Sequence, residues 1–119
     1  MPFVVALVDD LMFLPRIREA ARPQDVEVRS VRNATDVVEA CHGGAGLVFL
    51  DLDSARLPWA ETLAALAADP DVTVPAVGFV SHVHADRVRE AKAAGCGRVM
   101  ARSAFVQELP GLLAGVNRS

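Results

Sequence analysis

The stretch Leu47-Val-Phe-Leu-Asp51 decides the fold, because four apolar residues in succession end at a carboxylate. A continuous apolar run of this length is typical of a strand that is buried on both faces of a parallel sheet. The runs Phe3–Val8 and Pro75–Val80 have a similar form, and each is followed by a polar residue. Together the three runs predict a parallel sheet with helices on both faces.

The intervening segments complete a regular alternation of strands and helices. Val26–Val31 alternates apolar and polar residues, which predicts a half-buried strand at an edge, and Arg98–Ala101 predicts a short fifth strand. Apolar residues at helical spacing predict helices through residues 14–21, 37–41, 58–69, 85–94 and 105–116.

Polar residues and prolines mark the expected ends of these helices. Asn33 or Thr35 can cap the second helix, and the glycine pair after residue 42 can end it. Proline disrupts the interior of a helix but is tolerated in its first turn. We therefore expect Pro15 and Pro110 each to lie in an early turn.

The whole chain, residues 1–119, reads as one domain of (βα)5 form. Right-handed crossovers then give an open, doubly wound α/β sheet of five parallel strands. With the strand order 2-1-3-4-5, the third helix separates the helix that holds Cys41 from the helix that precedes Cys96. We therefore expect two free thiols and no disulfide.

Composition excludes several classes of function. The net charge is −3, the isoelectric point is about 5.5 and the mean hydropathy is +0.30. No basic face for nucleic acid or for an anionic membrane is expected. The apolar start of the chain has no basic leader and soon meets Asp9 and Asp10, which argues against a signal peptide or a membrane span and favours the cytoplasm.

Polar residues gather where the expected strands end. Asp9 and Asp10 follow the first strand, Asp51 ends the third, Ser81 follows the fourth and Arg102 follows the fifth. Ligands of open α/β sheets bind beyond the carboxyl ends of the strands, where the strand order reverses. Converging carboxylates suit Mg²⁺, and a hydroxyl with a cation suits a phosphoryl group. These residues predict a magnesium-assisted site for phosphoryl transfer to a carboxylate.

Four segments resemble the marker segments of response-regulator receiver domains (CheY-like, with a flavodoxin-like fold). They occur in the order typical of that family: Ala6–Asp10, Leu47–Asp51, Phe79–Ser81 and Ala94–Arg102. The resemblance implies Asp51 as phosphoacceptor, Ser81 as the conserved hydroxyl and Arg102 in place of the conserved lysine. It implies Mg²⁺ held by Asp9, Asp10, Asp51 and the backbone carbonyl of Asp53. It also implies a histidine kinase or another phosphodonor protein, and a separate output protein, as partners.

The chain departs from the receiver pattern at several positions. The stretch Asp53–Trp59 lacks the usual Met-Pro-x-x-Asp-Gly, and Ser103 stands where a proline usually follows the lysine. Arginine is larger than lysine and forks, so Arg102 is not a neutral replacement. Val99 stands where receivers have an aromatic residue on the fifth strand that takes part in switching. His82 replaces the small residue that usually follows the hydroxyl residue, and its ring could narrow access to Asp51.

The departures leave alternatives to a phosphorylated stand-alone receiver. One is a pseudo-receiver that binds a protein partner without phosphorylation; a weaker one is a small metal-dependent hydrolase. The Asp51-x-Asp53 pair also resembles the motif of haloacid-dehalogenase phosphatases, but it ends the wrong strand. The stretch Ser81–Arg87 resembles part of a zinc-hydrolase motif that lacks its last histidine. Whether two copies pair stays open.

Overall fold

The computed structural model describes residues 1–81 and 85–117, which form a five-stranded parallel sheet. The strands lie in the order β2-β1-β3-β4-β5, which confirms the predicted topology. Strands and helices alternate along the chain. In order, they are β1 (Phe3–Leu7), α1 (Leu14–Ala21), a short 3-10 turn η1 (Arg22–Gln24), β2 (Glu27–Ser30), α2 (Ala34–His42), β3 (Val48–Asp51), α3 (Trp59–Ala68), β4 (Ala76–Val80), α4 (Ala85–Ala93), β5 (Arg98–Ala101) and α5 (Arg102–Asn117).

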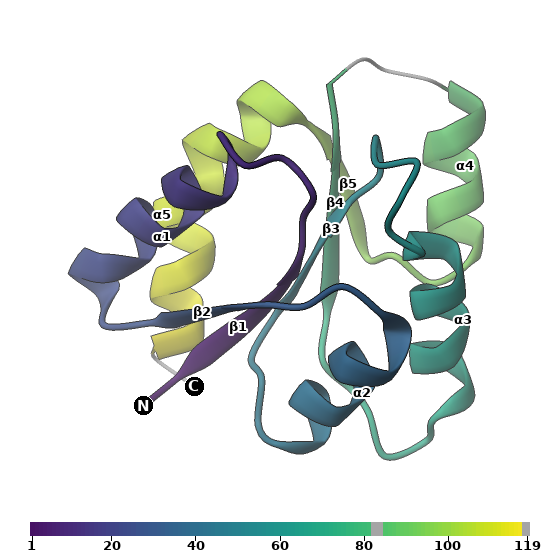
Figure 1. Ribbon diagram of the computed structural model, residues 1–119, viewed down its shortest axis with the longest axis horizontal. Coiled ribbons are helices and arrows are strands. Elements are labelled where there is room, and N and C mark those ends of the chain that lie inside the picture. Colours follow the sequence, from purple (N-terminus) through teal and green to yellow (C-terminus); the bar gives the residue numbers. More distant parts are fainter. Residues whose placement is uncertain (82–84, 118–119) are drawn as a thin grey trace.

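The helices form two layers on the sheet, with α1 and α5 on one face and α2, α3 and α4 on the other (Figure 1). Each layer closes over its own cluster of buried apolar side chains. The central strands β1, β3 and β4 are buried along their whole lengths, as their continuous apolar sequences predict. The edge strand β2 buries only Val28, as an alternating sequence requires.

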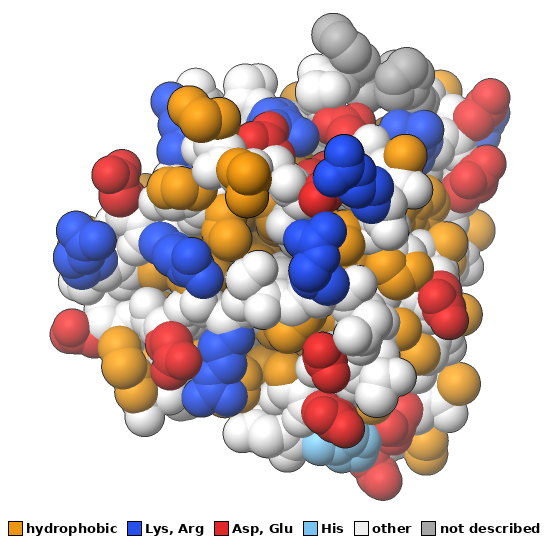
Figure 2. Space-filling model, in the orientation of Figure 1, with side chains coloured by type: hydrophobic (Ala, Val, Ile, Leu, Met, Phe, Trp, Pro, Cys, Tyr) orange, Lys and Arg blue, Asp and Glu red, His pale blue; other side chains and the backbone are white. Residues whose placement is uncertain are grey.

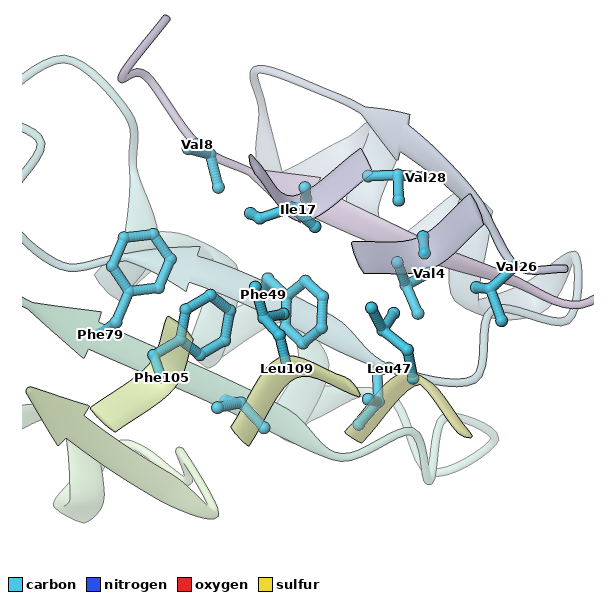
Figure 3. Packing of buried hydrophobic residues seen from close by; sticks show 14 of the residues in the cluster. Val4, Val8, Ile17, Val26, Val28, Leu47, Phe49, Phe79, Phe105 and Leu109 are labelled. Carbon is cyan, nitrogen blue, oxygen red and sulfur yellow. The ribbon is translucent and has the colours of Figure 1, made fainter. Parts of the chain in front are cut away.

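Aromatic rings fill the core between the sheet and α5. The ring of Phe105 stacks on Phe79 with centroids 4.7 Å apart and meets the edge of Phe49 at 5.1 Å. Figure 3 shows these rings in one packed row below β1 and α1, beside Leu109. The ring of Phe13 continues the row towards the carboxyl ends of the strands, 4.8 Å from Phe79. The row therefore ties the core directly to the edge of the sheet where a site is expected.

Local sequence signals account for both ends of α2 and for the start of α1. Asn33 caps α2, because its side-chain oxygen accepts the backbone N–H of Asp36 at 2.8 Å. Gly44 follows this helix at a φ of +108°, a conformation that favours glycine. Pro15 lies in the first turn of α1, as predicted. The side chain of Thr62, buried in α3, donates to the carbonyl of Pro58 at 2.7 Å and so is not left without a partner.

The expectation for Pro110 was wrong. The helix α5 begins at Arg102, so Pro110 lies in its interior and not in an early turn. Buried side chains at helical spacing, Phe105, Leu109, Leu113 and Val116, continue on both sides of the proline. Burial of this stripe against the sheet holds the helix together through a residue that supplies no N–H donor.

Both cysteines are buried free thiols, as predicted. Burial raises the pKa of Cys41 and of Cys96, which favours unreactive neutral thiols. Trp59 begins α3, is partly buried and packs against the cluster on that face of the sheet. In the described part of the chain, no helix has the length and apolar character needed to cross a membrane.

Candidate functional site

The register of the sheet brings the predicted residues to one edge. Leu50 pairs with Leu7 on one side and with Gly78 on the other, so the carboxyl ends of β1, β3 and β4 lie within two residues of one another at the same edge. One cavity of about 330 Å³ lies beyond these ends. It is lined by Asp9, Asp10, Asp51, Asp53, Ser54, Ala55, Arg56 and Arg102. We call this cavity the acidic cleft. Figure 2 shows acidic and basic side chains beside one another along this upper edge.

Asp51 lies at the floor of the acidic cleft and is only 2% exposed. One of its carboxylate oxygens accepts the backbone N–H of Asp53 at 3.1 Å. Burial raises the pKa of Asp51, and this effect outweighs the hydrogen bond and the attraction of Arg102, which lower it. A carboxylate that is buried yet lines an open cavity can act as a nucleophile towards a ligand that enters the cleft.

Arg102 spans the acidic cleft and contacts three of its carboxylates. Its Nη1 donates to Asp10 at 2.7 Å, and its Nη2 lies 3.3 Å from Asp53 and 3.7 Å from Asp51. Its guanidinium carbon lies 4.6 Å from the centre of the Phe13 ring. These contacts fix the orientation of a side chain that is 24% exposed.

Asp10 is held as an anion by several donors. It accepts the backbone N–H groups of Met12 at 2.8 Å and Phe13 at 3.2 Å, in addition to the bond from Arg102. The hydrogen bond from Arg102 lowers the pKa of Asp10 below its ordinary value, and the bond from Met12 adds to this effect. Asp10 therefore also caps the turn that enters α1, a role that acids at helix starts commonly have.

Asp53 contributes its side chain as well as its backbone. The carboxylate accepts the backbone N–H of Ser81 at 2.6 Å and lies 3.8 Å from the guanidinium of Arg87. The resemblance to receivers predicted only a role for the Asp53 carbonyl, so this side-chain contact is additional. Ser81 itself is exposed and lines a neighbouring cavity, which it shares with Asp10 and Arg102.

Asp9 belongs to a second group of contacts on the β2 side of the cleft. Its carboxylate accepts the hydroxyl of Ser54 at 3.3 Å and a bond from Arg32 at 3.3 Å. The oxygen of Ser54 also accepts the backbone N–H groups of Arg56 and Leu57, which fixes the loop after β3. Sequence reasoning missed Ser54 and Arg32, although the expected strand order places the end of β2 beside the end of β1.

The donor set fits a divalent cation in its chemistry. Carboxylates and a carbonyl are the oxygen ligands that Mg²⁺ takes, and all four acidic residues line the acidic cleft. Among the described residues, no three acidic, histidine or cysteine side chains are arranged to hold a metal ion as they stand. The guanidinium of Arg102 is the positive charge that lies between Asp10 and Asp51. Predictions about His82 and about the zinc-like motif, with His84, concern residues outside the described part.

Comparison with known proteins rests on structure alone, because no family model and no curated protein matches the sequence. A putative response regulator from Chloroflexus aurantiacus has a TM-score of 0.80 at 14% identity, over 100% of both chains. The receiver domain of a sensor histidine kinase from Pseudomonas aeruginosa has a TM-score of 0.79 at 15% identity, over 99% of this chain and 98% of that one. This chain has the receiver-domain fold. The prediction of a flavodoxin-like receiver architecture is confirmed.

Two receiver structures carry groups of the predicted chemistry. The Pseudomonas aeruginosa domain has a magnesium ion coordinated in its active-site cleft. The cyanobacterial phytochrome response regulator RcpA is phosphorylated; its TM-score is 0.74 at 19% identity, over 98% of this chain and 91% of that one. At such identities the likeness establishes the fold and not the chemistry of this receiver-like chain.

Proposed function

We propose that the chain is a receiver-type signalling domain in which Asp51 accepts a phosphoryl group. The observation that carries this proposal is the acidic cleft, where the buried carboxylate of Asp51 lies among three further acids and 3.7 Å from the guanidinium of Arg102. The magnesium-bound and phosphorylated receivers of the same fold support it. A phosphohistidine of a kinase, or an acyl phosphate, is the proposed donor.

Each residue has a definite part in this transfer. An oxygen of Asp51 attacks the phosphorus, the bond from phosphorus to the donor breaks, and the donor leaves with the electron pair of that bond. An acyl phosphate leaves as a carboxylate anion, and a phosphohistidine leaves as an imidazole that takes up a proton from solvent. Asp9, Asp10 and the carbonyl of Asp53 would hold Mg²⁺ beside Asp51. The ion supplies charge compensation for the phosphoryl oxygens when it is bound. Arg102 and the hydroxyl of Ser81 would donate to the same oxygens.

A second candidate is the pseudo-receiver, which binds a partner without phosphorylation. The contacts of Arg102 with Asp10, Asp51 and Asp53 favour it, because this guanidinium already places a positive charge from within the chain among the acids of the cleft. An output protein distinct from this domain would be the partner in either case. The metal-dependent hydrolase gains no comparable support from the described residues.

Phosphorylation is tested by intact mass spectrometry after incubation with acetyl phosphate and Mg²⁺. We expect the wild type to gain the mass of one phosphoryl group and Asp51→Asn to gain none, because the amide is not a nucleophile of this kind. The product should lose the added mass in hydroxylamine, which cleaves acyl phosphates. An unchanged wild-type mass would instead favour the pseudo-receiver, whose partner should bind wild type and Asp51→Asn equally.

A further inference from the structure

The guanidinium of Arg102 lies where opposing charges of the acidic cleft meet. Its two terminal nitrogens face Asp10 at 2.7 Å, Asp53 at 3.3 Å and Asp51 at 3.7 Å. The ring of Phe79, 5.3 Å from the guanidinium carbon, and the ring of Phe13 lie beside it. A planar cation with several donors can bridge carboxylates in this way, whereas a lysine ammonium is a single point of charge.

The carboxylate of Asp53 is surrounded by donors and cations, as the guanidinium of Arg102 is surrounded by carboxylates. Its carboxylate accepts the N–H of Ser81 at 2.6 Å and faces the guanidiniums of Arg102 and Arg87. A backbone donor and two cations on one anion are the groups that a phosphoryl oxygen would otherwise recruit. Arg102 and Asp53 therefore already give each other a counter-charge within the cleft.

We propose that Arg102 is the resident cation of the acidic cleft and that its ion pairs with Asp10, Asp51 and Asp53 exclude divalent ions until they open. The inference deepens the proposed function and rests on it for the role of the metal. A divalent ion reaching Asp10 and Asp51 must first displace a positive group from both, because like charges cannot share the cleft at contact distance. Phosphorylation would then be limited by opening of these ion pairs.

Metal affinity measured without any phosphodonor tests the proposal. Mn²⁺ is added to the wild type, to Arg102→Gln and to Arg98→Gln, and the free ion is counted by electron paramagnetic resonance. Arg98 is a matched control: it lies on the adjoining strand, and its guanidinium pairs with Glu108 at 2.8 Å on the surface. Both variants change the net charge equally, so a general charge effect would appear in both.

We expect Arg102→Gln to bind Mn²⁺ at least tenfold more tightly than the wild type, and Arg98→Gln to bind like the wild type. Equal affinities in the wild type and Arg102→Gln would overturn the proposal, as would equal gains in both variants. Circular dichroism checks that each variant is folded. If Arg102→Gln fails to fold, Arg102→Lys takes its place. This variant should bind Mn²⁺ more tightly than the wild type, because an ammonium cannot bridge three carboxylates. An unchanged affinity in Arg102→Lys would overturn the proposal.

The two proposals fail separately in these experiments. Tight Mn²⁺ binding by Arg102→Gln, with no mass gain from acetyl phosphate in either the wild type or this variant, would support the resident cation and refute Asp51 as phosphoacceptor. If the wild type is phosphorylated and Arg102→Gln binds Mn²⁺ no more tightly than the wild type, Asp51 is supported as phosphoacceptor and the resident cation is refuted.

Discussion

Replacing Asp51 by asparagine should stabilise the metal-free protein at neutral pH. The side chain of Asp51 is 3% exposed, so its charge is largely removed from water, at a cost of several kcal/mol. Arg102 at 3.7 Å repays about 4 kcal/mol at an effective dielectric constant of about 20. The like charges of Asp10 and Asp53, which share the same guanidinium, offset part of that attraction. Asparagine has no charge to bury and still offers an oxygen to the N–H of Asp53.

The expected gain at neutral pH is about 1–2 kcal/mol in the free energy of unfolding, and its size depends on pH. Burial raises the pKa of Asp51 above its unfolded value, so the folded protein keeps this proton to higher pH. Wild-type stability is therefore lost as the pH rises from about 3.9 through the folded-state pKa. The gain from Asp51→Asn should be absent in acid and complete at neutral pH. The opposite contribution of Asp10, whose pKa is lowered, is common to both proteins and cancels.

Urea denaturation followed by far-ultraviolet circular dichroism, with a chelator present, measures this difference. In a thermal scan of the same proteins, a gain of 1 kcal/mol corresponds to a rise of about 4 °C in the melting temperature for a domain of this size. Asp71→Asn is the control, since Asp71 is exposed. The reasoning is refuted if Asp51→Asn is less stable than the wild type at pH 7, or if its gain is the same at low pH.

Four further substitutions test the core and α5 by denaturation. Phe105→Ala should cost about 3–5 kcal/mol, because it removes a fully buried ring that stacks on two others; a loss below 1 kcal/mol would contradict the packing of the aromatic row. Gly78→Ala should lower the free energy of unfolding by about 1–3 kcal/mol, since its Cβ would lie 2.8 Å from Leu52 Cδ1. In Gly111→Ala the new Cβ meets nothing within 4 Å, and the free energy of unfolding should rise by up to about 1 kcal/mol. Pro110→Ala should raise stability by about 1–2 kcal/mol, because it restores an N–H donor inside a helix; a lower melting temperature would show that the proline is needed.

The parallel sheet was predictable because each buried strand has a continuous apolar sequence that ends at a polar residue, and its strand order followed from the doubly wound flavodoxin-like fold. Asp51 and Asp10 could be placed in one cleft for the same reason: parallel strands expose their carboxyl ends at one edge. The start of α5 was not predictable, since Arg102-Ser-Ala carries no strong capping signal and Pro110 suggested a later beginning. Tertiary burial decided this helix, and burial is not written in any local motif.

The contacts inside the cleft were beyond sequence reasoning. The position of Arg102 followed from alignment, but its three carboxylate partners depend on side-chain rotamers and on the row of rings beneath it. The Asp53 carboxylate reaches Ser81 only because the loop after β3 turns back over the cleft. Such pairings depend on loop geometry, which the composition of Asp53–Trp59 leaves open.

The position of Trp59 gives the molecule a built-in optical probe. The chain has one tryptophan and no tyrosine, so its indole accounts for nearly all intrinsic fluorescence. This ring begins α3, directly after the loop that Ser54 fastens to Asp9, and one side of it rests on the core. A shift in its emission would therefore follow rearrangement of that loop in unlabelled protein, in real time, whichever ligand or partner causes it.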